Sequence, residues 1–155
     1  ITASEGAALH LDNIRTRPGD FDPDVRDRLI AGAMIPAAWV TKAQKLRRQF
    51  HARMLDIFGD VDLLLASATP CRAPRIGQKT MVLGGVEMPV RPNLGIYTQP
   101  ISCIGLPVVA VPVWTDGITL PIGVQVIAPP WREDLALRAA AVLEARGVCS
   151  APVAR

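Results

Sequence analysis

About the first third of the chain carries apolar residues at every third or fourth position. This spacing gathers apolar side chains on one face of a helix. It predicts three helices, over residues 2–15, 23–32 and 36–58. Thr2 and Glu5 have the spacing of a capping box, and Asp22 before Pro23 is typical of an N-cap and first helical residue. The longest helix is expected to carry one apolar stripe, formed by Trp39, Ala43, Leu46, Phe50, Met54 and Ile57 or Phe58.

From residue 60 onward, apolar residues come in short continuous runs, which are typical of strands. Such runs predict strands over residues 61–66, 108–113 and 122–127, the first of them buried. Two further short runs flank Gly84 and Gly85, which predicts a hairpin with a two-glycine turn. Residues 89–107 are expected to be irregular or briefly helical. A last helix over residues 132–146 is expected to end at Gly147, before a loose tail.

The order of these elements predicts the organisation of the chain. Helices occupy residues 1–59, strands and loops residues 60–130, and a helix residues 131–147, with the tail at 148–155. This order indicates an α/β layer, but so few strands beside long helices rarely close a sheet alone. Apolar residues make up 50% of the chain and charged residues 20%. We therefore expect one portion of a single domain, which buries one side against more protein.

Composition narrows the classes of function. The net charge of +3 is mild and scattered, which disfavours a nucleic-acid surface. Apolar stretches stay shorter than about 18 residues, so no membrane span is expected. The cysteines Cys71, Cys103 and Cys149 lie far apart, without metal-ligand or disulfide spacing, which favours a reducing, cytoplasmic compartment. No signal peptide is visible, and a start at Ile1 inside a helix suggests that residues precede it.

A self-sufficient catalytic site is not evident in the residues. Ser102 lacks the glycines that a nucleophile elbow needs two positions before and after it. Cys103 lies in an apolar neighbourhood, where a packed thiol is expected. His10 and His51 have no partner at zinc-ligand spacing, and no glycine loop of the phosphate-binding type is present. We therefore expect neither a metal nor a cofactor.

Four segments in order, each weak alone, carry a specific resemblance. They are residues 62–70 (DLLLASATP), 98–100 (TQP), 105–112 (GLPVVAVP) and 120–128 (LPIGVQVIA). In this order the chain resembles the C-terminal part of amidase-signature hydrolases. The resemblance implies an α/β/α sandwich with a mixed twisted sheet. It also implies a Ser–cis-Ser–Lys triad in the N-terminal half of such enzymes, which has no counterpart in these residues, so no catalytic residue is assigned.

Within that family, residues 72–78 and 91–102 look most like the 1-carboxybiuret hydrolase subunit group. The substrate implied is a small linear amide, in kind a ureido acid such as 1-carboxybiuret, which loses ammonia. The C-terminal part would then complete the sheet and wall off the substrate pocket, with Thr98 and Gln99 near it. Arg28 and Arg91 are candidates to hold a substrate carboxylate, because a guanidinium binds carboxylate through two hydrogen bonds. Ordinary surface ion pairs are the alternative for both arginines.

Two other functions stay open. The chain can be a catalytically inactive fragment that docks onto an N-terminal half or another subunit, which predicts exposed apolar surface. The chain can also be part of a protein that resembles the A subunit of glutamyl-tRNA(Gln) amidotransferase. Gly95 argues against this alternative, because those subunits usually carry an acidic residue at that position. Enzymes of the 1-carboxybiuret group pair with a small helical subunit. The resemblance therefore implies such a partner, with a homo-oligomer as the other assembly.

Overall fold

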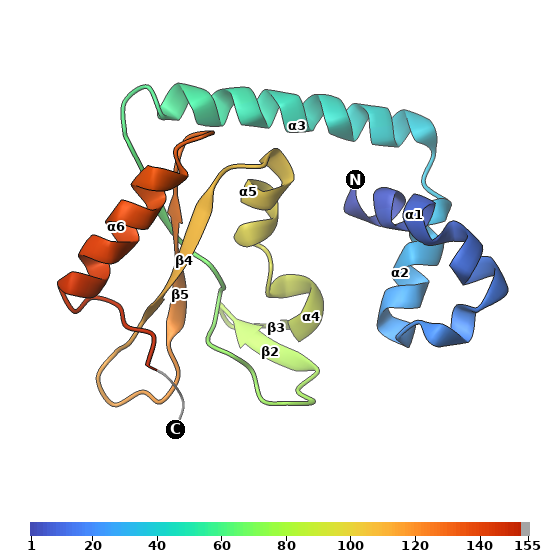
Figure 1. The fold of residues 1–155 in the computed structure, drawn as a ribbon. Helices are drawn as coiled ribbons and strands as arrows, with labels where there is room; N and C mark the ends of the chain where they lie inside the picture. Colours follow the sequence, from blue (N-terminus) through green and yellow to red (C-terminus); the bar gives the residue numbers. More distant parts are fainter. Residues whose placement is uncertain (153–155) are drawn as a thin grey trace. The chain divides into compact units, whose positions relative to one another are not determined.

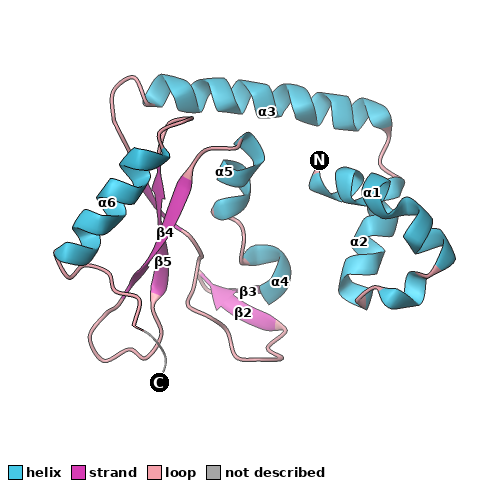
Figure 2. Ribbon diagram, in the orientation of Figure 1, coloured by secondary structure: helices cyan, strands magenta, loops and turns pink. Residues whose placement is uncertain are grey.

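The computed structural model of the chain describes residues 1–152. It divides into two compact units, Ile1–Phe50 and His51–Arg155, and the second is described as far as residue 152. Figure 2 shows that the first unit is helical, whereas the strands belong to the second. The boundary between the units falls within the longest helix, α3 (Ala37–Ile57).

The first unit begins with two helices that pack closely against each other, α1 (Thr2–Thr16) and α2 (Pro23–Ala33). A 3-10 turn at Pro18–Asp20 connects them. Gly32 is buried in their contact, and a Cβ atom built on it would overlap the carbonyl oxygen of Ala3. The two backbones can approach this closely because residue 32 has no side chain.

The predicted helices of this unit are confirmed, with ends shifted by one or two residues. Asp22 caps α2 as predicted, since its carboxylate accepts the backbone N–H of Asp24 at 2.9 Å. The predicted capping box of α1 is wrong. Thr2 already lies inside the helix, Ile1 is the N-cap, and no side chain caps it. The backbone N–H of Glu5 donates instead to the carbonyl of Ile1 at 3.0 Å.

The second unit is built on a three-stranded antiparallel sheet in the order β1 (Leu64–Ser67), β5 (Ile122–Ile127), β4 (Val108–Val113). The predicted hairpin is confirmed as β2 (Thr80–Leu83) and β3 (Val86–Pro89). Gly84 and Gly85 form its turn with φ angles of 56° and 81°. Left-handed angles at both central residues are those of the tight turns that match strand twist, and glycine adopts them without strain.

Helices cover the two faces of the three-stranded sheet. Helix α6 (Glu133–Ala145) packs against β4 and β5 on one side, and α5 (Thr98–Ile104) lies on the other (Figure 1). The short helix α4 (Val90–Asn93) precedes α5 in the chain. The core under α6 is formed by Val111, Val126, Ala128, Ala136 and Cys149. The helix predicted over residues 132–146 and the brief helical structure within 89–107 are thereby confirmed.

Two predictions about this unit are wrong. The first strand begins at Leu64 and is not buried, because it is an edge strand with one neighbour, and Leu65 is 63% exposed. The tail is not loose after Gly147, because Cys149 is buried and pairs with Val113 of β4. The rest of that prediction, at residues 153–155, lies outside the described residues.

Candidate functional site

The first turn of α5 carries two of the predicted site residues, Thr98 and Gln99. Both are tied to Gly95: the backbone N–H of Gln99 donates to its carbonyl at 2.8 Å, and the Thr98 hydroxyl donates to it at 3.4 Å. The Gln99 side chain also lies over Gly95, where an added Cβ atom would be 3.0 Å from Gln99 Nε2. The exposed Gln99 side chain thus packs against Gly95 and would have to shift slightly for a side chain at position 95.

The start of α5 is anchored to the sheet by Gln125 of β5. This residue is 2% exposed. Its Nε2 atom donates to the carbonyl of Ser67 at 2.9 Å and to the carbonyl of Tyr97 at 3.2 Å. Gln125 lies within one of the family segments, but the sequence predicted no role for it. The available signal was a lone amide within the apolar strand of residues 122–127.

The four predicted site residues lie on three helices. Thr98 is half-buried and Gln99 exposed, side by side on α5. Arg91 is exposed on α4, in the same unit. Arg28 is exposed on α2, in the first unit. The structure therefore brings Thr98 and Gln99 together, while a shared role with the two arginines stays a prediction.

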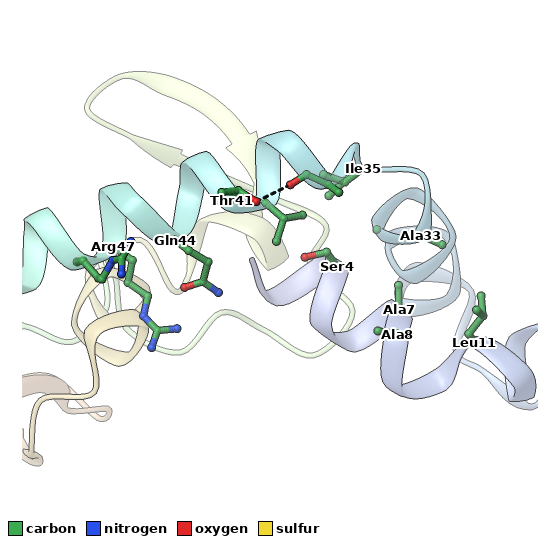
Figure 3. Close-up of a pocket in the computed structure, with 13 residues that line it drawn as sticks. Ser4, Ala7, Ala8, Leu11, Ala33, Ile35, Thr41, Gln44 and Arg47 are labelled. Atoms are coloured by element: carbon green, nitrogen blue, oxygen red, sulfur yellow. Dashed lines mark hydrogen bonds between the residues drawn. The ribbon is translucent and has the colours of Figure 1, made fainter.

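A separate pocket of about 760 Å³ lies within the first unit (Figure 3). It is lined by Ser4, Ala7, Ala8, Leu11, Gly32, Ala33, Ile35, Ala37, Val40, Thr41, Gln44, Arg47 and Arg48. Its hydroxyls are engaged locally, since Ser4 donates to the carbonyl of Ile1 at 2.8 Å and Thr41 to that of Ala37 at 3.1 Å. Gln44 reaches from α3 to Glu5 of α1 at 3.4 Å. None of the four predicted site residues lines this pocket.

One ion pair at the start of α6 shifts the pKa values of both its members. A hydrogen bond from Arg132 lowers the pKa of Asp134, and the same contact raises the pKa of Arg132. Both groups are on the surface at the start of the helix. Within residues 1–152, no three His, Cys, Asp or Glu side chains gather as a metal site would need. None of the helices there is long and apolar enough to cross a membrane.

Comparison with known proteins decides the family. The family model for amidases matches residues 3–137. The chain belongs to the amidase-signature family. It is 49% identical over 151 residues to AtzE, a 1-carboxybiuret hydrolase subunit of Pseudomonas sp. (strain ADP), covering 96% of this chain and 33% of that protein. It is 33% identical to the A subunit of glutamyl-tRNA(Gln) amidotransferase of Rhizorhabdus wittichii, over 92% of this chain and 29% of that protein.

The amidase-signature fold is also found in solved structures. One of them, an inhibitor-bound vestigial protein complex described as revealing the evolutionary origins of an s-triazine catabolic enzyme, superposes with a TM-score of 0.93. Its sequence is 46% identical, and the match covers 98% of this chain and 34% of that chain. The expected α/β fold class is confirmed, and within residues 1–152 both sheets are antiparallel. The chain spans about a third of the length of the curated relatives it matches.

Proposed function

We propose that this chain is the C-terminal portion of an amidase that hydrolyses a linear amide, in kind a ureido acid such as 1-carboxybiuret, and releases ammonia. The observation that carries the proposal is the 49% identity to a 1-carboxybiuret hydrolase subunit over nearly the whole chain. The anchored turn at Thr98 and Gln99 supports it, because rigidly held polar groups are what a substrate wall requires. The enzyme would act in the cytoplasm without a cofactor.

The residues of the chain would bind and orient substrate, while the family's Ser–cis-Ser–Lys triad would lie elsewhere in the domain. Thr98 and Gln99 have hydroxyl and amide groups suited to the N–H and C=O groups of a ureido substrate. Arg91, on α4 of the same unit, is the candidate to bind its carboxylate, because a guanidinium binds a carboxylate through two hydrogen bonds. Arg28 of the first unit is a separate candidate for the same role. Orientation of this kind accelerates acyl transfer by holding the scissile carbonyl in reach of the nucleophile.

The second candidate is a catalytically inactive fragment that docks onto an N-terminal half or another subunit, called here the docking half. Exposed apolar residues of α3 favour it. Trp39 is 70% exposed, Leu46 is 65% exposed, and both lie on the predicted stripe of α3. Such surface fits any chain that is normally covered by more protein, whether the rest of an amidase domain or a separate chain. The vestigial complex among the similar structures supports a protein partner, which we propose to be a small helical subunit, with a homo-oligomer as the alternative.

The amidotransferase function is less well supported, although A subunits of that enzyme are among the relatives. Those A subunits usually carry an acidic residue at the position of Gly95, and this chain has no side chain there. The turn therefore presents the uncharged amide of Gln99 and no carboxylate from position 95. This favours a substrate other than one recognised through its amine.

The proposal is tested on the complete reading frame that contains residues 1–155. The purified protein should release ammonia from 1-carboxybiuret faster than from biuret or glutamine, whereas the 155 residues alone should release none. Arg91→Met should raise KM for 1-carboxybiuret about tenfold and leave KM for uncharged biuret unchanged. The matched control is Arg75→Met, at an exposed arginine outside the proposed site.

The outcomes separate the candidates. Preference for glutamine would support the amidotransferase function instead. A reading frame that begins near Ile1 and yields a protein without amidase activity would support the docking half. Equal effects of Arg91→Met on charged and uncharged substrates would remove Arg91 from the carboxylate site.

A further inference from the structure

Gln125 is the buried polar side chain among residues 1–152, and its position in the sheet explains how it fits. It lies on the central strand β5, directly opposite Ala66 of β1 and Ala110 of β4. Because both neighbours are alanines, the longer Gln125 side chain extends past them, out from this face of the sheet. The buried amide is therefore placed to reach backbone groups of other segments.

Its two hydrogen bonds connect segments that are distant in sequence. Ser67 ends β1 and Tyr97 directly precedes α5, so one amide ties both to the central strand. Tyr97 is the N-cap of α5 but makes no capping hydrogen bond with its side chain. The start of this helix is therefore held by the local hydrogen bonds to the Gly95 carbonyl and, from the sheet, by the Gln125 amide.

We infer that Gln125 is a positioning residue, which fixes the Tyr97 carbonyl and through it the place from which Thr98 and Gln99 contact an amide substrate. The inference rests on the proposed function for its catalytic consequence. Its structural content is independent of the substrate: without Nε2, the Tyr97 carbonyl loses its hydrogen bond from β5. An apolar side chain of equal length could fill the same space but could not donate to either carbonyl.

The test compares two substitutions of neighbouring buried residues in the complete enzyme. Gln125→Met keeps the length of the side chain and removes both donated hydrogen bonds. The matched control Val126→Ala removes apolar contacts on the α6 face and leaves the Tyr97 anchor intact. Gln125→Met should lower kcat/KM on the order of 10- to 100-fold, mostly through kcat, because misplaced binding groups orient substrate poorly. Val126→Ala should change kcat/KM less than about threefold.

A second readout needs no activity. The backbone N–H of Gln99 donates to the carbonyl of Gly95. Its hydrogen exchange should become about tenfold faster in Gln125→Met and stay unchanged in Val126→Ala. Gln99→Ala should lower kcat/KM far less in the Gln125→Met background than in the parent enzyme, because the effects of substitutions at residues that act as a unit are not additive.

Each result decides a stated point. Unchanged exchange at Gln99 in Gln125→Met would overturn the inference whatever the substrate. Equal losses of kcat/KM in Gln125→Met and Val126→Ala, or full additivity with Gln99→Ala, would show a general structural role and also overturn it. An enzyme that cleaves no amide would contradict the proposed function alone, and faster exchange would still support Gln125 as the anchor of the turn.

Discussion

The two faces of the three-stranded sheet are held in different ways. On the α6 face, apolar side chains close a core that includes Val126 and Ala136, which are 0% and 1% exposed. On the opposite face, β5 presents the amide of Gln125 to the segment before α5. Apolar packing is tolerant of direction, whereas hydrogen bonds fix the position of specific atoms. Apolar burial also contributes on this second face, because Ile127, two residues along β5 from Gln125, is 2% exposed. The difference is that the α6 face relies on apolar packing, whereas the second face adds hydrogen bonds that fix the segment before α5.

The largest expected effect comes from a charge in the α6 core. Val126→Asp buries an unpaired carboxylate among apolar side chains and should lower the free energy of unfolding by about 3–5 kcal/mol. Urea unfolding of the complete enzyme measures this loss. The control Val142→Asp, at a residue of α6 that is 53% exposed, should change it by less than about 0.5 kcal/mol. Similar losses in both variants would contradict the reliance of this face on apolar packing.

A smaller effect, on activity rather than stability, is expected at α5. Gln99→Ala removes an exposed amide and should lower kcat/KM about tenfold, or about 1.4 kcal/mol of transition-state stabilisation, while the unfolding midpoint stays constant. Steady-state kinetics with the ureido substrate provides the measurement. Gln49→Ala, at an exposed glutamine of α3, is the control of the same residue type. A fall in stability without loss of activity would mean that Gln99 has a structural role rather than one in binding.

The residue that follows α5 allows a test of backbone strain on the sheet face that α5 covers. Gly105 follows the helix with a φ angle of 73°, where a side chain is strained although no atom lies within 4 Å of an added Cβ. Gly105→Ala should therefore cost about 1 kcal/mol in unfolding free energy. The control is Gly19→Ala, because an added Cβ atom there also meets no atom within 4 Å but the φ angle is not left-handed. This substitution should lower the melting temperature less than Gly105→Ala does. Equal costs would rule out backbone strain as the cause.

The smallest effect concerns the surface of α6. The hydrogen bond from Arg132 makes the pKa of Asp134 lower in the folded chain than in the unfolded one. The pair therefore contributes stability above the ordinary titration range of the carboxyl group, and this contribution is lost as pH falls through the lowered pKa. Asp134→Asn should be slightly less stable than the parent at neutral pH and equal to it in acid. Unfolding curves at both pH values test this. Arg132→Met should show the same dependence of stability on pH as Asp134→Asn.

The sequence predicted features that depend on neighbouring residues. Asp22 beside Pro23 specifies a helix start, and Gly84 with Gly85 specifies a tight turn, wherever the rest of the chain lies. The misplaced cap at Thr2 shows the limit of this approach, because a helix can begin one residue earlier without a side-chain cap. Local signals therefore predicted the elements but not every boundary.

Features that depend on distant residues were missed. Gln125 contacts carbonyls 58 and 28 positions away, so no local pattern could reveal its role. Burial of Cys149 and exposure of β1 likewise depend on which strands are neighbours in the sheet. Of the candidate site, the sequence supplied Thr98 and Gln99 through the family resemblance, whereas the anchor that holds them became visible only in three dimensions.

The edge position of β1 has a consequence for handling the protein in solution. β1 pairs with β5 along one side, and Leu65 projects from it with 63% of its surface exposed. An open strand edge with an apolar residue is a template for pairing with another copy. Concentrated preparations of the 155-residue chain should therefore aggregate through added strands, and a lysine in place of Leu65 should improve solubility.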